Sequence, residues 1–319
     1  MDPTVSIVTP SYNQERYIAE AIGSVLRQEG EFELEHVVID GASTDGTVEI
    51  LKRYEERVRG GEWAGRCRGI RFRWVSEVDR GQSAAIGKGF GMTGGQFCSW
   101  LNSDDTLLPG AIDGVLDTFR RNPEAGLVYG QVHFSDVSGR TVAEVETGPT
   151  DYEGLATLNL ICQPGAFFRR EAWDAVGGLD ENLQYTMDHD LWIRIAARFP
   201  LVFLPKPLAT YRLHGESKTG ADRHAVAFQE ETLRVIQSHY GRAPLNRVYG
   251  YSVRKIQELF PSGWSEANLL VVAPSFLLTL WEYLRRNRGV RREDLQMIRV
   301  GNLRKMFRER VSFRRDSQS

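Results

Sequence analysis

Short apolar runs alternate with longer amphipathic stretches over the first 130 residues of the chain. Runs rich in β-branched and aromatic side chains are typical of strands, and apolar positions that recur every three or four residues are typical of helices. The alternation predicts successive βαβ units around a mainly parallel sheet. The predicted strands cover residues 5–9, 36–40, 71–75 and 97–101, and the predicted helices cover 14–27, a stretch ending at 54, 83–90 and a stretch from about 109 to 122.

The pattern changes after residue 126. Two apolar runs separated by a Ser-Gly turn predict an antiparallel hairpin, and the chain looks helical from about residue 221 onward. We therefore predict an α/β fold with a mixed, mainly parallel central sheet flanked by helices, and a C-terminal helical extension. The elements predicted in the second half are hairpin strands at 127–134 and 141–145, strands at 166–168 and 202–204, and a helix from about 188 to 198.

These elements divide the chain into two parts. Residues 1–220 form the predicted α/β domain, and residues 221–319 form the helical extension. A length of 319 residues exceeds the usual size of one domain, and one enlarged domain with an appendage accounts for it as well as two domains do. The content of 41% apolar and 26% charged residues is ordinary for a soluble globular protein.

Three features bear on the compartment. No basic stretch followed by an apolar core opens the chain, so we expect no secretory signal. The three cysteines are widely separated, which predicts reduced thiols in the cytoplasm. Residues 269–284 are mostly apolar, but Pro274 and Glu282 interrupt them, and sixteen residues fall short of the roughly 20 that span a bilayer. We expect a core helix or an interfacial helix there.

The net charge of −2 conceals an uneven distribution. Residues 285–319 contain twelve Lys and Arg against four Asp and Glu, an excess of +8 that leaves −10 for the rest. A basic tail on an acidic body predicts attraction to an anionic surface. The tail has no recognisable nucleic-acid motif, so we expect no nucleic-acid partner and a peripheral contact with the cytoplasmic face of a membrane. A solvated helix face is the alternative.

Four acidic clusters are the strongest sign of chemistry. Three follow predicted strands, and the fourth opens a predicted helix. An open α/β sheet binds its ligand beyond the carboxyl ends of its strands, so these carboxylates should converge there. Their mutual repulsion then requires a metal ion or hydrogen-bond donors, which predicts a metal-dependent enzyme acting on a phosphorylated ligand. The clusters are Asp40, Asp79, Asp104 with Asp105, and Asp188 with Asp190.

Several motifs occur in the order of one known family. The segments VSIVTPSYN from Val5, VIDGASTDGT from Val38 and LNSDD from Leu101 resemble glycosyltransferase family 2. GGLD, MDHDLWIR and YRLH extend the resemblance, which covers about residues 4–217. It implies the GT-A fold of nucleotide-diphospho-sugar transferases and inverting sugar transfer. It also implies a nucleotide-binding half at about 1–125 and an acceptor half at about 126–220.

The resemblance implies a donor site at the first strand ends. Asp40 would accept a hydrogen bond from the imide of a pyrimidine base, which favours a UDP- or dTDP-sugar. Thr9, Pro10 and Tyr12 would wall the base pocket, and Asp79 would contact the base or the ribose. From the residues alone, Asp40 is also suited to capping the turn that follows it, and Asp79 to a helix N-terminus.

The resemblance also implies a divalent cation, Mn²⁺ or Mg²⁺, that bridges the two phosphates. Asp104 would be its direct ligand, because hard oxygen ligands suit these ions. Asn102, where the family has Asp, would bind ribose hydroxyls, and Asp105 would bind through water or orient the loop. Late in the match, His214 would ligate the metal or hydrogen-bond the leaving group, and Arg212 or Lys218 would neutralise the diphosphate.

The same resemblance implies a general base at the start of a helix. The family usually has Glu-Asp there; in this chain Met187 replaces the Glu and Asp188 matches the Asp. Asp188 is therefore the predicted base for the acceptor hydroxyl, with Asp190 as the second candidate. Both acids also suit helix capping. The acceptor itself, a carbohydrate, a lipid-linked group or another hydroxyl, is not specified by the sequence.

Two other functions remain open from the residues. A nucleotidyltransferase also combines an α/β sheet with acidic strand ends and a metal, but it should carry a Gly-rich basic loop where this chain has TPSYNQ. A non-catalytic protein that binds nucleotide sugars is the other alternative. The retained Asp104 and Asp188 argue against it.

Overall fold

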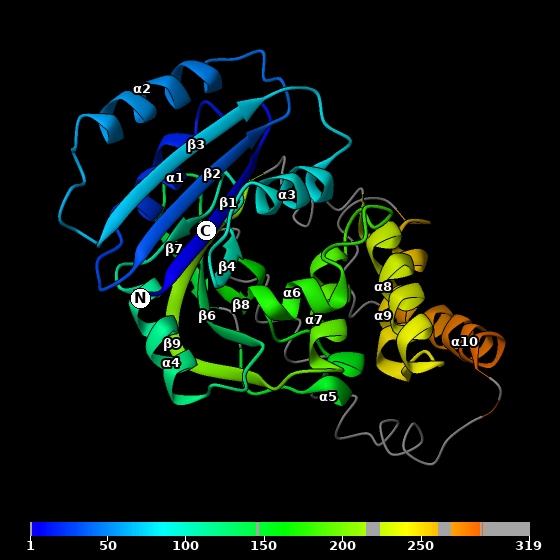
Figure 1. Cartoon of the computed structure of the whole chain (residues 1–319). Helices are drawn as coiled ribbons and strands as arrows, with labels where there is room; N and C mark the ends of the chain where they lie inside the picture. Colours follow the sequence, from blue (N-terminus) through cyan, green and yellow to red (C-terminus); the bar gives the residue numbers. More distant parts are fainter. Residues whose placement is uncertain (1, 145–146, 215–223, 261–268, 288, 290–319) are drawn as a thin grey trace. The chain divides into compact units, whose positions relative to one another are not determined.

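The structure is a computed structural model that describes residues 2–144, 147–214, 224–260, 269–287 and 289 (Figure 1). The chain divides into two compact units. The first comprises Met1–Leu155 with Asn159–Leu213, and the second comprises Ala156–Leu158 with His214–Ser319.

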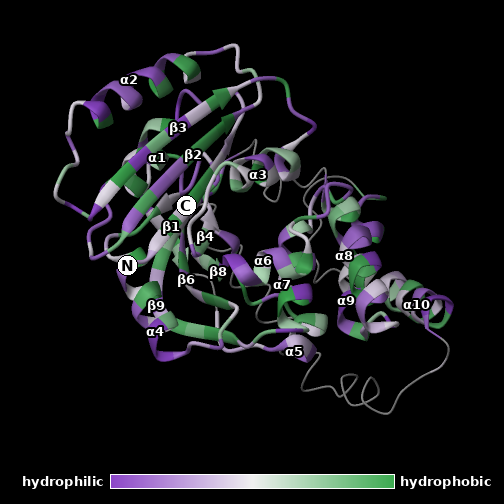
Figure 2. Ribbon diagram, in the orientation of Figure 1, coloured by the Kyte–Doolittle hydropathy of each residue, from purple (hydrophilic) through white to green (hydrophobic). Residues whose placement is uncertain are grey.

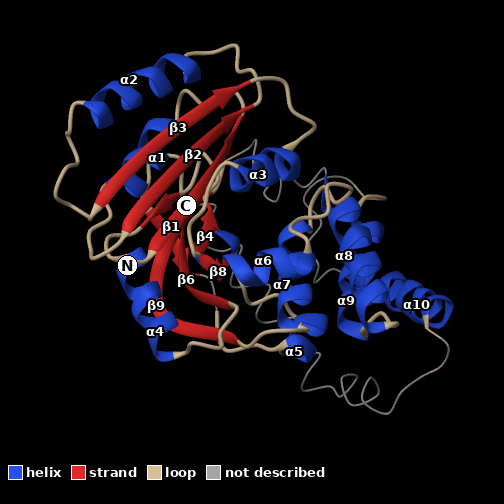
Figure 3. Cartoon of the chain, in the orientation of Figure 1, coloured by secondary structure: helices blue, strands red, loops and turns tan. Residues whose placement is uncertain are grey.

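The first unit is built on one sheet. Its strands are β1 Thr4–Ser11, β2 Glu33–Asp40, β3 Gly69–Ser76, β4 Phe97–Trp100, β5 Thr106–Leu107, β6 Leu127–Ser135, β7 Thr141–Glu144, β8 Ala166–Arg169 and β9 Leu201–Arg212. They are arranged in the order β3-β2-β1-β4-β8-β6-β9-β5, with β7 paired to β6 (Figure 3). β1 to β4 are parallel, as are β6 and β9, whereas β8, β7 and β5 pair antiparallel to their neighbours. The predicted mixed, mostly parallel sheet and the predicted hairpin are confirmed.

Helices cover both faces of this sheet. They are α1 Ile18–Leu26, α2 Thr47–Arg59, α3 Gln82–Gly91, α4 Ala111–Arg121, α5 Tyr152–Thr157, α6 Arg170–Val176 and α7 Met187–Ala196, with a 3-10 turn, η1, at Gln163–Gly165. Side chains of β2 point alternately to the two faces of the sheet. Leu34 and Val38 belong to the main core with α1, α2 and α4. Val37 and Ile39 pack with Ala85 of α3. Purple and green segments alternate along α2, as expected for a helix with one buried side (Figure 2).

One glycine lets α3 approach the sheet. A Cβ atom at Gly89 would lie 2.4 Å from Cγ1 of Val8 on β1. Any larger residue would therefore push α3 away from the strand. This close approach matters because the first turn of α3 reaches the candidate site described below.

The largest departure from the predicted elements is β9. It runs from Leu201 to Arg212, whereas the sequence predicted a strand at 202–204. Pro205 and Pro207 interrupt the apolar pattern, but β6 accommodates them by shifts of register around Gln131, and proline is tolerated at such irregularities. The structure also contains β5, α5 and α6, which the sequence did not predict because two to seven residues are too few to show a period.

The described part of the second unit is helical, as predicted. Its helices are α8 Ala225–Tyr240, α9 Leu245–Gln257 and α10 Leu269–Arg286. They enclose a small core of Leu233, Val248, Tyr251 and Tyr283. Among the described residues, no helix combines the length and apolar character needed to cross a membrane. The predicted basic tail from residue 290 onward lies outside the described residues.

Candidate active site

Three acidic clusters lie at the carboxyl ends of neighbouring parallel strands. Asp40 is the last residue of β2, Asp79 follows the end of β3 by three residues, and Asn102 follows the end of β4 by two. The first three strands end at one level, because Ser11, Asp40 and Ser76 are register partners. The strand ends therefore bring these groups to the edge where an open α/β sheet binds ligands.

Asp40 is fully buried and holds the turn that follows β2. Its carboxylate accepts hydrogen bonds from the Ser43 N–H at 2.9 Å, from the Ser43 hydroxyl, and from the Ser76 hydroxyl at 2.6 Å. The last bond links the end of β2 to the end of β3. This is the turn-holding role that the sequence left open beside recognition of a base.

The loops after β1 and β2 are hydrogen-bonded to each other. The Asn13 N–H donates to the Ser43 hydroxyl, and the Asn13 side-chain oxygen accepts the Thr44 N–H, each at 2.8 Å. Asn13 has a φ of 52°, a left-handed conformation that Asn adopts more readily than most residues. The two loops therefore brace the backbone beside Tyr12.

The ring of Tyr12 and the carboxylate of Asp79 both lie close to Gly41. Tyr12 is 60% exposed. A Cβ atom at Gly41 would lie 3.0 Å from Oδ2 of Asp79 and 3.5 Å from Cδ2 of Tyr12. Because glycine has no side chain, the space between ring and carboxylate stays open. Asp79 is held in place by the Gly81 N–H, which donates to its Oδ1 at 2.8 Å.

Thr9 and Pro10 do not wall this space. Both are buried, because β1 continues to Ser11, and the Thr9 hydroxyl lies 3.0 Å from Nε2 of His36 in the interior. This differs from the expected base-pocket role. Of the three residues predicted on β1 and its loop, only Tyr12 is exposed.

The loop after β4 is organised around the side chain of Asn102. Its oxygen accepts a hydrogen bond from Gln82 at the start of α3 at 2.7 Å, and its nitrogen donates to Gln163 of η1 at 3.2 Å and to Asp105 at 3.3 Å. Gln163 in turn donates to the Trp100 carbonyl at 2.7 Å. The predicted role of Asn102 was contact with ribose, whereas the structure shows three protein partners.

The two carboxylates of this loop differ in environment. Asp105 is 1% exposed and accepts the Arg212 N–H at 3.0 Å. Burial raises the pKa of Asp105 well above its usual range, and the neighbouring charge of Asp104 adds to the effect. Asp104 is half-buried. Asp104 is therefore the more accessible of the two carboxylates, and Asp105 is the one that holds the loop.

Arg212 secures the loop from β9. Its Nε donates to the Asp104 carbonyl at 3.0 Å, and another nitrogen pairs with Glu20 at 2.5 Å. The guanidinium also lies 5.0 Å from the centre of the Tyr17 ring. Arg212 is only 4% exposed. Because its donors are directed at protein groups, we reassign Arg212 from neutralising a diphosphate to positioning the acidic loop.

The structure shows less about the other two predicted ligands of the cation and the diphosphate, His214 and Lys218. His214 belongs to the second unit and is half-buried, and Lys218 lies outside the described residues. The described residues contain no group of three or more His, Cys, Asp or Glu that could hold a metal by itself. The described residues would supply only part of the ligands of a cation. Asp104 would supply one hard oxygen, and a bound nucleotide would supply others.

Asp188 and Asp190 occupy the first turn of α7 but have different partners. Asp190 is 7% exposed, and one of its oxygens accepts two hydrogen bonds from Arg194, at 2.6 and 2.8 Å. Asp188 is half-buried and accepts the N–H of His189 at 2.8 Å. Asp190 is therefore held in an ion pair with Arg194 along α7.

Aromatic packing and one sulfur contact fix α7 beside the acidic loop. Trp192 of α7 stacks on Trp100 of β4 with ring centres 5.4 Å apart, and both are fully buried. The Ser83 hydroxyl of α3 lies 2.8 Å from the Met187 sulfur. The starts of α3 and α7 and the end of β4 are therefore tied together.

Cys162 directly precedes η1 and is half-buried. Burial raises the pKa of its thiol, and the charges of Asp105 and Asp188 raise it further. Gln82 and Cys162 were not predicted as site residues from sequence, because an amide or a thiol outside a motif carries no signal there.

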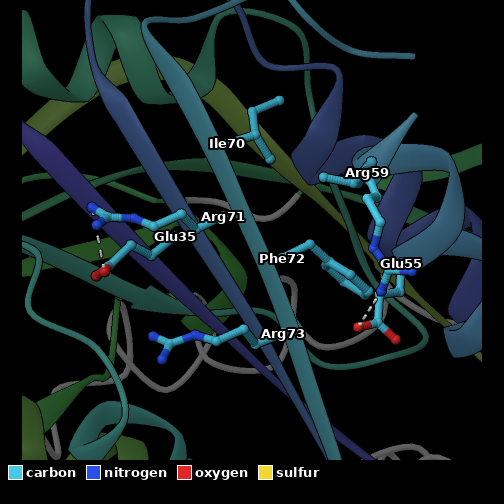
Figure 4. A pocket seen from close by; sticks show the side chains of 8 residues that line it. Glu35, Glu55, Arg59, Ile70, Arg71, Phe72 and Arg73 are labelled. Atoms are coloured by element: carbon cyan, nitrogen blue, oxygen red, sulfur yellow. Dashed lines mark hydrogen bonds and ion pairs between the residues drawn. The ribbon is translucent and has the colours of Figure 1, made fainter. Parts of the chain in front are cut away.

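A hollow of about 510 Å³ lies elsewhere in the first unit, between residues of β2, β3 and α2 (Figure 4). It contains none of the predicted site residues. Four of its charged side chains form two pairs, with Arg71 at 3.5 Å from Glu35 and Arg59 at 3.2 Å from Glu55, and Arg73 donates to the Met92 carbonyl. This hollow is therefore distinct from the strand-end site.

Comparison with known proteins identifies the family. The model of "Glycosyl transferase family 2" matches residues 6–177, which confirms the resemblance seen in the motifs. Chondroitin synthase of Escherichia coli is 26% identical over 264 residues, 80% of this chain and 37% of that protein. Hyaluronan synthase of Pasteurella multocida is 26% identical over 216 residues, 67% of this chain and 21% of that protein. The chain thus spans a little over a third of the first of these relatives and about a fifth of the second.

Solved structures share the fold. TarS of S. aureus in complex with UDP-GlcNAc is 18% identical with a TM-score of 0.58, covering 89% of this chain and 81% of that one. The mannosyltransferase PcManGT of Pyrobaculum calidifontis, in complex with GDP-Man and Mn²⁺, is 18% identical with a TM-score of 0.58, covering 95% and 88%. At this identity the likeness concerns the fold alone. The family match over more than half of the 319 residues shows that the chain belongs to glycosyl transferase family 2 and is a glycosyltransferase.

Proposed function

We propose that this glycosyltransferase transfers a sugar, with inversion, from a nucleoside diphosphate to an acceptor hydroxyl, with Asp188 as the general base. The observation that carries the proposal is the stacking of Trp192 of α7 on Trp100, the last residue of β4, because Asp188 opens α7 and the acidic loop follows β4. A donor held by the loop would present its anomeric carbon toward α7.

The chemistry assigned to the chain is a single displacement. Asp188 removes the proton of the acceptor hydroxyl, the oxygen attacks the anomeric carbon, and the bond to the diphosphate breaks on the opposite face. Asp104 would hold a divalent cation, Mn²⁺ or Mg²⁺, whose contribution is to neutralise charge on the leaving diphosphate. Asp105 and Arg212 act by keeping Asp104 in place.

For the donor we propose a pyrimidine nucleotide, UDP or dTDP. The exposed Tyr12 ring offers a stacking face, and the Asp79 carboxylate across Gly41 offers an acceptor for an imide N–H. Asp40 supports this pocket by holding the turn that contains Gly41. Since the structural neighbours bind a uridine nucleotide in one case and a guanosine nucleotide in the other, the base must be tested directly.

For the acceptor we propose a hydroxyl of a carbohydrate or of a lipid-linked sugar, in bacterial polysaccharide or glycoconjugate synthesis. Support comes from the relatives, which include chondroitin and hyaluronan synthases. Both names describe enzymes that make polysaccharides. This chain corresponds to only part of each, so its own acceptor belongs to the proposal.

Thermal unfolding tests the donor and the cation together. UDP- and dTDP-sugars should raise the melting temperature more than GDP-sugars, and Mn²⁺ should add to the rise. The Asp104→Ala variant should lose the Mn²⁺-dependent part, whereas Asp117→Ala, on the exposed side of α4, should keep it. Strongest stabilisation by a GDP-sugar would overturn the pyrimidine assignment. An unchanged Mn²⁺ effect in Asp104→Ala would remove Asp104 from the ligands.

A further inference from the structure

One side of α10 is apolar and exposed. Leu277 is 73% exposed, Leu270 59%, Trp281 58%, Leu280 57% and Leu284 51%. These residues recur every three or four positions, so they lie along one side of the helix. Ala273 and Phe276 are also exposed and extend this surface, which we call the α10 apolar face.

The opposite side of α10 is fixed in the helical core of its own unit. Val271, Ser275, Thr279 and Tyr283 are buried. At the C-terminal end, the buried Glu282 accepts hydrogen bonds from Arg285 at 2.6 Å and from Arg286 at 2.9 Å, and Arg286 reaches Glu230 of α8 at 2.8 Å. The helix cannot turn its apolar face inward without breaking these contacts.

The α10 apolar face is broad and carries no acidic side chain. At 3.6 residues per turn, its seven residues span roughly 140° of the helix, wider than the narrow stripe of a two-helix seam. Among the described residues of α10, the exposed charge beside this face is Arg285, whose guanidinium lies 5.3 Å from the Trp281 ring. The sequence that begins there, residues 285–319, has twelve Lys and Arg against four Asp and Glu.

We infer that the α10 apolar face docks on the surface of an anionic lipid membrane, independently of the sugar chemistry proposed above. The apolar side chains would enter the boundary between headgroups and acyl chains, and Arg285 beside them would meet lipid phosphates. The 18-residue helix would lie along the surface, since no described helix has the character of a membrane span.

Charge favours lipid over a second copy of the chain. A second copy would bring another segment with an excess of +8 toward the first, and like charges oppose that approach. An anionic surface complements the same excess. Self-association is therefore the competing outcome of the test.

The test is co-sedimentation of the full chain with vesicles of phosphatidylcholine alone or mixed with phosphatidylglycerol. Binding should require phosphatidylglycerol and weaken with added salt, because exposed charges are screened. The double variant L277E/L280E should bind at least about tenfold more weakly, because two exposed leucines no longer enter the lipid. The matched control is Leu259→Glu, which replaces a leucine that is 75% exposed beyond the end of α9 and should bind as the parent does.

Three results would overturn the inference. The first is equal binding to vesicles with and without phosphatidylglycerol, and the second is full binding by the double variant. The third is a parent chain that ignores vesicles but forms dimers in solution that the double variant dissociates. Unfolding curves of the variants exclude a loss of fold, since both replaced leucines are more than half exposed.

Discussion

Arg212 stabilises the candidate site through the backbone of the acidic loop. Its guanidinium is buried against the Asp104 carbonyl, the Val137 carbonyl and Glu20. Lysine at this position keeps the charge but cannot reach all three acceptors. Arg212→Lys should therefore lower the free energy of unfolding by about 1–3 kcal/mol, the usual result of leaving buried polar groups without partners. Urea unfolding measures the change.

The matched control is Glu20→Gln. Glu20 is 54% exposed at its side chain, so losing its charge should change stability by less than about 1 kcal/mol. Metal-dependent nucleotide binding should fall together with stability in Arg212→Lys. If Arg212→Lys loses nucleotide affinity at unchanged stability, Arg212 contacts the diphosphate instead.

His36 gives the fold a dependence on pH. Complete burial lowers the pKa of His36 from 6.5 to about 3, because an imidazolium would lose its hydration in the interior. Between these values the unfolded chain binds the proton and the folded chain does not, so stability falls as the pH falls below 6.5. Through this residue, the free energy of unfolding of the parent should fall by about 2 kcal/mol between pH 6.5 and pH 5. Urea unfolding of His36→Gln at both pH values should show a loss smaller by that amount, and an equal loss would contradict the assignment.

Residue types at the site could be predicted, but their partners could not. Asp40, Asp104 and Asp188 stand out because they belong to spaced motifs at predicted element ends. Thr9 and Arg212 are in such motifs too, yet the structure buries both. Whether a side chain near the end of a strand is buried depends on the residue at which the strand ends. A sequence pattern predicts that end residue less reliably than it predicts the strand itself.

At the scale of elements, the parallel βαβ half follows the hydrophobic pattern closely, because its two central strands, β1 and β2, are long and buried on both faces. The second half follows it less well. β9 contains two prolines and pairs with β6 across register shifts, which depends on tertiary pairing rather than on local preference. The position of α7 also depends on tertiary contacts, through Trp192 and Met187.

The stacking of α7 on the sheet should matter for turnover. Trp192→Leu removes the stack on Trp100 and should let Asp188 shift, so the release of nucleoside diphosphate should slow even where the donor still binds. Loss of a large buried aromatic also lowers stability by up to about 3–5 kcal/mol. Trp63→Leu is the control. Trp63 is also a buried tryptophan in an aromatic stack, but its partner is Tyr54 of α2, which contributes no residue to the candidate site. Equal turnover in the two variants would contradict a positioning role for Trp192.

At the scale of the whole molecule, the family match ends at residue 177, and the second unit begins, apart from three residues, at His214. The family therefore accounts for the strand-end site but not for the helices α8 to α10. Their exposed apolar face has no counterpart in the catalytic proposal. Sequence could indicate the helices and the basic tail, but only the structure shows which side of α10 is buried.

The most direct measurement of the central claim compares Asp188→Asn with Asp190→Asn. Each variant is assayed for affinity toward the best-stabilising nucleotide sugar and for release of nucleoside diphosphate. Asp188→Asn should keep donor affinity within a few-fold and lose roughly 100- to 10,000-fold in turnover, the usual contribution of a general base. Asp190→Asn should mainly lose stability, because it breaks the pair with Arg194. Normal turnover by Asp188→Asn would contradict the account.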